Sequence, residues 1–313
     1  MTEKNFDDNS IVVSISCITY NHAPYIRQCI DGFLMQQTNF AFEVLIHDDA
    51  STDGTTEIIK EYEAKYPEII KPIYEEENQW VKGRRGSAVF NFPRAKGKYI
   101  ALCEGDDYWT DPLKLQKQVD FLEDNPNYVM CSHCYDTLIE PSGKLIENTR
   151  QGGFSYSISN YVRGEWGCST LSTVFRLTCI KKLPYPIEID VCLFYAILKQ
   201  GDGYCMKDIM SVYRIHNQGV WSGIDINKRN ALDFDIRLSL YDIDKSESSA
   251  VLILGLFTKN ISRKWLFCNL KRLIKSMAII MHHYGSKYAL SILVKKMCFN
   301  YRFQFKDSES LLS

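Results

Sequence analysis

The sequence predicts an α/β protein with a mostly parallel central sheet flanked by helices. Residues 99–103 are apolar and β-prone without alternation, which is typical of a buried strand. Residues 11–18 and 42–47 indicate two more strands, and helical patterns follow them at 25–36 and 55–66. Strand, loop and helix in repetition is the order that builds parallel sheets. We therefore expect the three strand ends to meet at one edge of the sheet, where open α/β sheets bind ligands.

Residues that favour helix starts and turns lie at the expected ends of these elements. Pro24 suits the first positions of the first helix, and Ser51, Thr52 or Asp53 can cap the second. Residues 139–159 contain Pro-Ser-Gly and Gly-Gly sequences, which indicate a hairpin turn followed by a variable loop.

Three carboxylates follow the strand at 99–103, in Glu104-Gly105-Asp106-Asp107. Adjacent acids repel one another unless they share a cation. Mg²⁺ and Mn²⁺ accept carboxylate oxygens and also bridge phosphates. This segment therefore predicts a site for a metal-bound diphosphate. A second acidic pair, Asp48-Asp49, follows the strand at 42–47, and Thr19-Tyr20-Asn21-His22 follows the strand at 11–18.

Four segments in this order resemble the inverting nucleotide-sugar glycosyltransferases of family 2, which have the GT-A fold. They are 16–21, 48–55, 95–100 and 104–107, and the resemblance covers residues 10–220. It implies a metal-dependent transfer of a sugar from a nucleoside diphosphate donor, with UDP favoured, to an acceptor hydroxyl. The implied acceptor is a saccharide or lipid-linked saccharide, in bacterial-type cell-surface polysaccharide or glycolipid synthesis.

The resemblance assigns roles within 104–107. Asp106 is the implied ligand of Mn²⁺ or Mg²⁺. Glu104 stands where the family more often has Asp, and it reaches the metal or the ribose through water. Asp107 either completes the metal shell or caps the segment that follows.

The nucleotide sugar is expected over the first two strand ends. Asp49 matches the family position that binds the uracil ring. Thr19 and Tyr20 match positions that line the base pocket, where a tyrosine ring can stack on the base. The other implied donor-binding residues are Asn21, Asp48 and Gly105. Asp48 has an alternative role as a turn residue at the entry to a helix. Lys82, Arg84, Arg85 and Arg94 are the candidates for contact with the diphosphate, and the sequence does not choose among them.

An inverting transfer also needs a base that removes the acceptor proton. Asp190 aligns best with the family's base, although the usual Glu-Asp or Gly-Asp doublet is Ile189-Asp190 here. Glu188 is the second candidate, and an N-cap is the alternative role for Asp190. His216 matches a family position that reaches the metal or diphosphate, with a purely structural role as the alternative. Trp221, between two glycines, suggests a lid over the donor.

Composition fits an enzyme of the cytoplasm. The chain has 313 residues, a net charge of −1 and eleven cysteines. No secretory signal precedes the first strand, and several cysteines lie in apolar runs, so we expect free thiols in a reducing compartment. Cys131-Ser132-His133-Cys134 lacks a second ligand pair at zinc spacing and is better explained as a strand.

Residues 251–306 contain eleven Lys or Arg and no Asp or Glu. Charges interrupt every long apolar run, so a spanning helix is not expected. Basic amphipathic helices suit peripheral contact with an anionic membrane, here the inner face of the plasma membrane. The alternatives are a helical subdomain with a solvated basic face and a dimer surface. Nucleic acid is not expected as a partner, because no binding motif is present.

These interpretations divide the chain into a polar tail (1–9), a catalytic domain (10–223), a basic helical extension (224–306, with 226–241 as one helix) and a second tail (307–313). Within the catalytic domain, 10–107 would bind the nucleotide and 108–223 the acceptor. Two other function classes are considered. One is a non-catalytic sugar-nucleotide binding module. The other is a nucleotidyltransferase, which would need a Gly-rich basic loop where residues 19–24 stand.

Overall fold

The computed structural model describes residues 10–84, 86–140, 142–149, 151–165, 167–180, 189–217, 219, 225–258 and 268–299, with side chains up to 294. The chain divides into two compact units. One combines Met1–Ser157 with Trp166–Asn217 and is called the sheet unit here. The other combines Ile158–Glu165 with Gln218–Ser313 and is called the helical unit.

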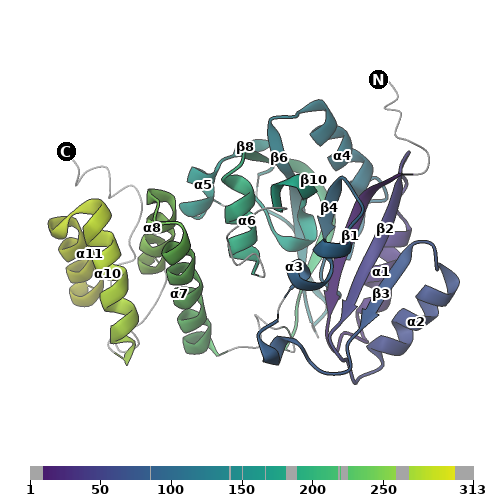
Figure 1. The fold of residues 1–313 in the computed structure, drawn as a ribbon, viewed down its shortest axis with the longest axis horizontal. Coiled ribbons are helices and arrows are strands. Elements are labelled where there is room, and N and C mark those ends of the chain that lie inside the picture. The colour runs from purple at the N-terminus through teal and green to yellow at the C-terminus, as the bar shows by residue number, and fades with distance from the viewer. Residues whose placement is uncertain are drawn as a thin grey trace. The chain divides into compact units, whose positions relative to one another are not determined.

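The sheet unit begins with the predicted parallel strands. Its sheet has the order β3-β2-β1-β4-β9-β6-β10-β5, in which β1, β2, β3 and β4 are mutually parallel where they pair (Figure 1). These four strands are β1 (Ile11–Thr19), β2 (Ala41–Asp48), β3 (Ile70–Tyr74) and β4 (Tyr99–Leu102). Helix α1 (Ile26–Leu34) joins β1 to β2, and α2 (Thr55–Lys65) joins β2 to β3.

The second half of the sheet is mixed. The long strands β6 (Tyr128–Ile139) and β10 (Asp202–Ile215) are parallel, and β9 (Val174–Arg176) is antiparallel to both β4 and β6. The short antiparallel strands are β5 (Tyr108–Trp109), β7 (Lys144–Ile146) and β8 (Phe154–Tyr156). The pairing of β7 with β6 confirms the predicted hairpin, and Cys131–Cys134 lie within β6 as the sequence predicts.

The remaining elements of the sheet unit are short or lie between strands. They are α3 (Ser87–Phe90), α4 (Lys114–Asp124), α6 (Asp190–Leu198) and the 3₁₀ turns η1 (Trp80–Lys82), η2 (Phe92–Arg94), η3 (Thr170–Ser172) and η4 (Leu177–Ile180). The core lies between the sheet and its helices, where Ile15, Ile30, Val44, Tyr99 and Leu115 are fully buried. Burial of such β-branched and aromatic side chains is what holds the parallel strands in register.

Strand register brings the polar loops together. Thr19 at the end of β1 pairs with Asp48 at the end of β2, and Ser16 pairs with Leu102 of β4. The backbone N–H of Asp49 then donates to Thr19 O (3.0 Å), and that of Gly105 donates to Ile18 O (3.0 Å). The three loops that the sequence places at one edge are therefore hydrogen-bonded neighbours.

The helical unit has its own core. Its elements are α5 (Ile158–Val162), α7 (Ile226–Ile243), α8 (Glu247–Leu254), η5 (Gly255–Thr258), α10 (Leu270–Tyr284) and α11 (Ser286–Phe299). Asp225 caps α7 by accepting from the N–H groups of Asn227 and Lys228, and Ser246 caps α8. Residues 158–165, which the sequence assigns to the acceptor part of the catalytic domain, belong to this unit. Among the described residues, no helix is long and apolar enough to cross a membrane.

Candidate metal and donor site

The loop after β1 is fixed to the loop after β2. Asn21 has φ +54°, a left-handed conformation that Asn tolerates. Its N–H donates to Ser51 Oγ (2.9 Å), and its Oδ1 accepts from the N–H of Thr52 (2.8 Å). The N–H of His22 donates to Thr55 Oγ1 (2.8 Å). Asn21 thus orders both loops, which is a different use of this residue from the donor contact that the sequence predicts.

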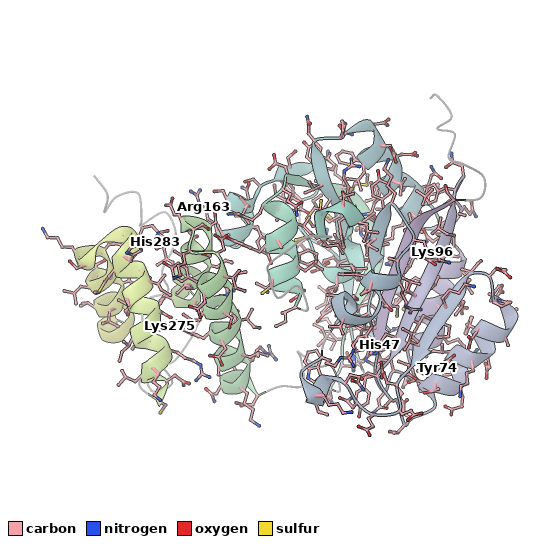
Figure 2. All side chains as sticks on the ribbon, viewed as in Figure 1. His47, Tyr74, Lys96, Arg163, Lys275 and His283 are labelled. Carbon is pink, nitrogen blue, oxygen red and sulfur yellow. The ribbon has the colours of Figure 1, made fainter. Side chains whose placement is uncertain are left out.

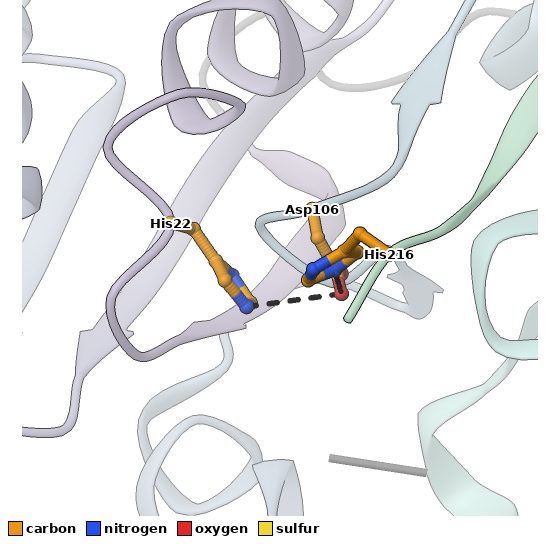
Figure 3. Close-up of side chains that lie close together, drawn as sticks. All are labelled: His22, Asp106 and His216. Carbon is orange, nitrogen blue, oxygen red and sulfur yellow. Dashed lines mark hydrogen bonds and ion pairs between the residues drawn. The ribbon is translucent and has the colours of Figure 1, made fainter. Parts of the chain in front are cut away.

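Gly105 brings the acidic segment against the end of β1. A Cβ atom at Gly105 would lie 2.6 Å from Thr19 Oγ1, closer than real Cβ contacts come. Only glycine therefore allows the 104–107 segment to approach β1 this closely. The approach places the Asp106 side chain beside the loop that carries His22 (Figure 3).

Asp106, His22 and His216 form a cluster that could hold a metal ion, with one ligand atom from each within 4.8 Å of the others. Asp106 Oδ2 lies 3.0 Å from His216 Nε2 and 3.7 Å from His22 Nε2 (Figure 3). The three come from the loop after β1, the loop after β4 and the residue after β10. Asp106 and His216 are predicted from the sequence, whereas His22 as a ligand is not.

The electrostatics of this cluster suit a cation. Burial is the largest influence on His22, and it lowers the pKa of that imidazole despite the opposing charge of Asp106. Burial by itself would raise the pKa of Asp106, but the His216 hydrogen bond and the nearby imidazoles lower it overall. At neutral pH the cluster therefore offers a neutral imidazole and a carboxylate, which are the forms that bind metals. Asp106 Oδ1 is buried and has no hydrogen-bond partner among the described residues, so a cation would satisfy it.

Asp107 lies outside this cluster and bonds to the backbone. Its Oδ1 accepts from the N–H of Arg214 (2.8 Å), while the guanidinium of Arg214 donates to the carbonyl oxygen of Asp106 (2.7 Å). The same guanidinium donates to Gln28 Oε1 and packs over the rings of Tyr25 and Tyr108, 5.0 and 4.5 Å from their centroids. Among the described residues, Asp107 neither joins the clustered ligand atoms nor bonds through its side chain to the segment that follows, so neither role considered for it is observed; it binds β10 instead.

Arg214 is a site residue that sequence reasoning missed. It is 5% exposed, at the end of β10 and two residues before His216. The signal that could have revealed it is an arginine in the mostly apolar end of a strand, residues 209–215, close to a candidate ligand. Such a residue needs buried partners, because an isolated buried charge is costly.

Glu104 faces a pocket that also contains Asp190. The pocket is lined by Ser16, Ile18, Gly86, Ser87, Phe92, Leu102, Cys103, Glu104, Thr170, Asp190 and Leu193. Burial, reinforced by the charges of Asp106 and Asp190, raises the pKa of Glu104 to about 8. The structure does not bring Glu104 into the cluster of Asp106, His22 and His216, although the sequence predicts it as a ligand.

Asp190 is the first residue of α6, and the N-cap position belongs to Ile189. Asp190 Oδ1 accepts from the N–H of Val191 (2.7 Å), within the first turn. The alternative role of Asp190 as an N-cap is therefore not observed. A carboxylate in the first turn of a helix is stabilised by the helix dipole. Glu188, the second candidate for the base, and Trp221 lie outside the described residues.

The predicted donor-binding acids have partners within the protein. Asp48 Oδ1 accepts from Ser51 Oγ (2.5 Å) and Ser51 N–H (3.2 Å), and its Oδ2 accepts from Thr56 Oγ1. This geometry favours the helix-entry role for Asp48. Asp49 accepts from the N–H groups of Gln79 (2.6 Å) and Trp80 (3.1 Å), which fixes the start of η1. Tyr20 is 41% exposed.

The basic candidates for diphosphate contact have separate surroundings. Arg94 donates to the carbonyl oxygens of Lys71 and Ile46, so it joins strands together. Arg84 donates to Gln79 Oε1 (3.3 Å), and Lys82 pairs with Glu77. Arg85 lies outside the described residues. Within the described part of the chain, Lys82, Arg84 and Arg94 thus bond away from the cluster of Asp106, His22 and His216.

Comparison with known sequences identifies the relatives of this chain. Residues 14–178 match the family model described as Glycosyl transferase family 2. The uncharacterized protein Rv1520 of Mycobacterium tuberculosis is 36% identical over 219 residues, which are 69% of this chain and 62% of Rv1520. TuaG of Bacillus subtilis, whose name assigns it to teichuronic acid biosynthesis as a glycosyltransferase, is 29% identical over 216 residues, 67% of this chain and 82% of TuaG. The chain thus spans less than two thirds of the length of the first of these relatives.

Solved structures share the fold. S. aureus TarS in complex with UDP-GlcNAc has a TM-score of 0.64 and 16% identity, covering 92% of this chain and 89% of that chain. The mannosyltransferase PcManGT from Pyrobaculum calidifontis, in complex with GDP-Man and Mn²⁺, has a TM-score of 0.51 and 16% identity, covering 96% of this chain and 86% of that one. The predicted α/β architecture of the GT-A type, a mostly parallel sheet flanked by helices, is thereby confirmed.

Proposed function

The chain belongs to glycosyl transferase family 2, and we propose that it is a metal-dependent inverting glycosyltransferase that moves a sugar from a nucleoside diphosphate donor to an acceptor hydroxyl. The observation that carries the proposal is the cluster of Asp106, His22 and His216, next to a pocket that contains Asp190. Family membership alone leaves open which residues act, and these two features supply candidates for the two roles that the reaction needs.

The first role is neutralisation of the charge that develops on the leaving diphosphate. Asp106, His22 and His216 would hold the cation, and a bound divalent ion would supply that neutralisation. Two imidazoles and one carboxylate suit Mn²⁺ better than Mg²⁺, because Mg²⁺ strongly prefers oxygen ligands. Arg214 would keep the Asp106 loop in place while the donor binds.

The second role is removal of the acceptor proton. We assign it to Asp190, with Glu188 as the second candidate. Asp190 lines the same pocket as Glu104, and its place in the first turn of α6 favours the anionic form that a base needs. An acceptor hydroxyl bound in this pocket would give its proton to Asp190 as the new glycosidic bond forms.

The donor is proposed to be a UDP-sugar. Thr19, Tyr20 and Asn21 after β1, Asp48 and Asp49 after β2, and Gly105 after β4 lie at adjoining strand ends. The exposed ring of Tyr20 can stack on the base. UDP-GlcNAc and UDP are bound by TarS and GDP-Man by PcManGT, which supports a nucleotide sugar without fixing the base.

The acceptor is proposed to be a saccharide or lipid-linked saccharide of a cell-surface polysaccharide or glycolipid. The support is the name of TuaG, which assigns that relative to teichuronic acid biosynthesis. Such acceptors are extended at membranes, so we place the protein in the cytoplasm, peripheral to the inner face of the plasma membrane.

Donor hydrolysis tests the chemistry. The purified chain would be mixed with Mn²⁺ and a panel of UDP-, GDP- and dTDP-sugars, and release of nucleoside diphosphate would be followed. We expect release from one donor, loss of release in Asp106→Ala, and normal release in Glu61→Ala, which alters an exposed acid on α2. If no donor is cleaved and Mn²⁺ does not promote nucleotide binding, the catalytic proposal fails and a non-catalytic binding module takes its place.

Asp190→Asn separates the two roles. This variant keeps the side-chain shape but removes the base, so donor binding should be unchanged while transfer to an acceptor falls by about 10²-fold or more. Transfer at the wild-type rate would remove Asp190 from the proposal.

A further inference from the structure

Helix α10 of the helical unit is apolar on two sides. Leu273, Ile279 and Ile280 are buried in the core of this unit. Leu270, Ile274 and Met281 face outward instead, with 52%, 59% and 47% of their surface exposed. Spacings of four and seven residues put these three side chains on one stripe along the helix. We call Leu270, Ile274 and Met281 the α10 stripe.

Basic side chains border the α10 stripe. Lys271, Lys275 and His282 are exposed, and helical geometry places them on the adjacent strip of the surface (Figure 2 labels Lys275). No Asp or Glu occurs anywhere in residues 268–299. In α11, Leu290 and Val294 are also exposed, with Lys287 one turn before Leu290. Exposed apolar residues and basic residues therefore occur together on both helices.

The structure narrows the segment that the sequence proposes for membrane contact. Residues 252–257 are buried in the core of the helical unit, so the beginning of 251–306 is not available to a membrane. Arg272 bonds to Asp235 through two contacts of 2.7 and 2.8 Å, and Lys275 bonds to Asp242 (2.7 Å). Helix α7 thus supplies acids that the basic segment itself lacks. Among the residues of this segment whose side chains the structure describes, the outward face of α10 and α11 is what remains for an external partner.

We propose that the α10 stripe docks on an anionic membrane surface, with its three apolar side chains entering the interface and Lys271 facing the headgroups. Charge complementarity selects this occupant, since α10 and α11 carry no acid of their own and the exposed Lys271 and Lys287 beside their outward apolar residues match an anionic surface. A second copy of the chain would bring two basic faces together, which like-charge repulsion opposes. The inference rests on the proposed membrane location and not on the proposed chemistry.

Vesicle binding tests the proposal. The full chain would be sedimented with phosphatidylcholine vesicles that contain or lack phosphatidylglycerol, at 0.1 M salt, where surface charges still act over about 10 Å. We expect binding to the anionic vesicles and little to the neutral ones. The double variant Ile274→Ser/Met281→Ser should bind at least tenfold more weakly, because it removes most of the apolar area of the stripe.

Matched controls separate the stripe from general surface effects. Ile226→Ser replaces an isoleucine of similar exposure, 56%, on α7 and should bind as the wild type does. Lys271→Gln should weaken binding about fivefold, the effect expected for one basic residue near an anionic surface. Lys228→Gln on α7, also exposed, should have little effect.

Three results would overturn the inference. The first is no binding of the wild type to anionic vesicles, and the second is equal binding by the double variant. The third is a dimer, in light scattering without lipid, that the double variant converts to monomers, which would make the stripe an interface between copies. Donor hydrolysis in solution is measured on the same samples. Vesicle binding without hydrolysis would defeat the proposed chemistry alone, and hydrolysis without vesicle binding would defeat this inference alone.

Discussion

The guanidinium of Arg214 donates a hydrogen bond to the carbonyl oxygen of Asp106, 2.7 Å away, and this bond links the end of β10 to the segment that carries the candidate metal ligand. The backbone N–H of Arg214 is in turn bound by the carboxylate of Asp107 (2.8 Å). Arg214 thus holds two adjacent acids of the 104–107 segment. Its guanidinium binds the backbone carbonyl oxygen of Asp106, and its backbone N–H binds the carboxylate of Asp107. The arrangement leaves the carboxylate of Asp106 to face His22 and His216.

Arg214→Lys should weaken Mn²⁺ binding by about tenfold or more. Lysine cannot reach Asp106 O and Gln28 together, and loss of a hydrogen bond from a charged group costs about 1.5–3 kcal/mol. The effect is measured by calorimetric titration of the folded protein with Mn²⁺. Arg27→Lys is the control, because Arg27 is half-exposed and pairs with Glu61 outside the site. Unchanged affinity in Arg214→Lys, with only a lower Tm, would make Arg214 a residue of stability alone.

His22→Gln should also lower Mn²⁺ affinity by at least about tenfold, since one of three candidate ligands is lost. His282→Gln, on the exposed side of α10, should leave the affinity unchanged. Because burial lowers the pKa of His22 below its usual 6.5, protons compete with the metal only in more acidic solution. The contribution of His22 to the affinity, measured as the difference between the wild type and His22→Gln, should therefore stay constant from pH 7.5 to 6.5 and fall in more acidic solution. A decline that begins near pH 7.5 would contradict this explanation.

Glu104→Gln should stabilise the metal-free protein at pH 8 but not at pH 4.5. Burial and the charges of Asp106 and Asp190 raise the pKa of Glu104 to about 8 in the folded state, against 4.5 in the unfolded chain. Between pH 4.5 and 8 the folded state keeps a proton on Glu104 that the unfolded chain has lost. The contribution of Glu104 to the free energy of unfolding is therefore lost as pH rises from about 4.5 to 8. Glutamine removes that loss, which is on the order of a few kcal/mol. The measurement is urea unfolding with EDTA at both pH values, and equal stability at pH 8 would contradict the prediction.

Lys114→Met should stabilise the protein most at neutral pH. Lys114 is fully buried, donates to Gln118 Oε1 (2.8 Å) and packs over Trp109. Burial lowers its pKa to about 7 from 10.5, so between these values the unfolded chain binds the additional proton. The free energy of unfolding of the wild type therefore contains a term that rises as pH increases from 7 to 10.5, by up to about 5 kcal/mol.

Methionine removes this term, so the difference in stability between Lys114→Met and the wild type should shrink from pH 7 to pH 9.5. Lys117→Met provides the contrast, because hydrogen bonds to Asp111 and Asp208 raise the pKa of Lys117 and place its titration above this range. A difference that is independent of pH would mean that Lys114 is not titrating in the folded state.

Much of the fold is predictable from the sequence because its signals are local. Apolar runs give β1, β2 and β4, the helical patterns after the first two give α1 and α2, and the acids after β4 give Asp106. Asp190 at the start of α6 follows from a family pattern. The antiparallel strand β9, inserted between β4 and β6, is not predictable in this way, because three residues carry no period and their pairing is decided by distant neighbours.

The unpredicted parts of the site depend on tertiary contacts. His22 becomes a candidate ligand only because the 104–107 segment lies against the loop after β1. Arg214 can be identified as a site residue only when its hydrogen bonds to Asp106 O and Gln28 are known. Counting charges along the chain also misses tertiary contacts, because Arg272 and Lys275 form ion pairs with aspartates of α7, outside the acid-free segment. The helix-entry role of Asp48 and the bond between Asp107 and Arg214 likewise depend on hydrogen bonds that residue spacing does not reveal.

The origin of the three clustered side chains has a consequence for biosynthesis. His22 leaves the ribosome early, whereas His216 follows β10, the last described strand of the sheet unit, so the candidate cation site cannot be completed before that strand has been made and paired. A metal that binds only the completed cluster would stabilise the finished sheet and none of its earlier fragments. Nascent chains that stop before β10 should thus gain no protection from Mn²⁺ against proteolysis, which would leave them open to clearance while the full sheet is retained.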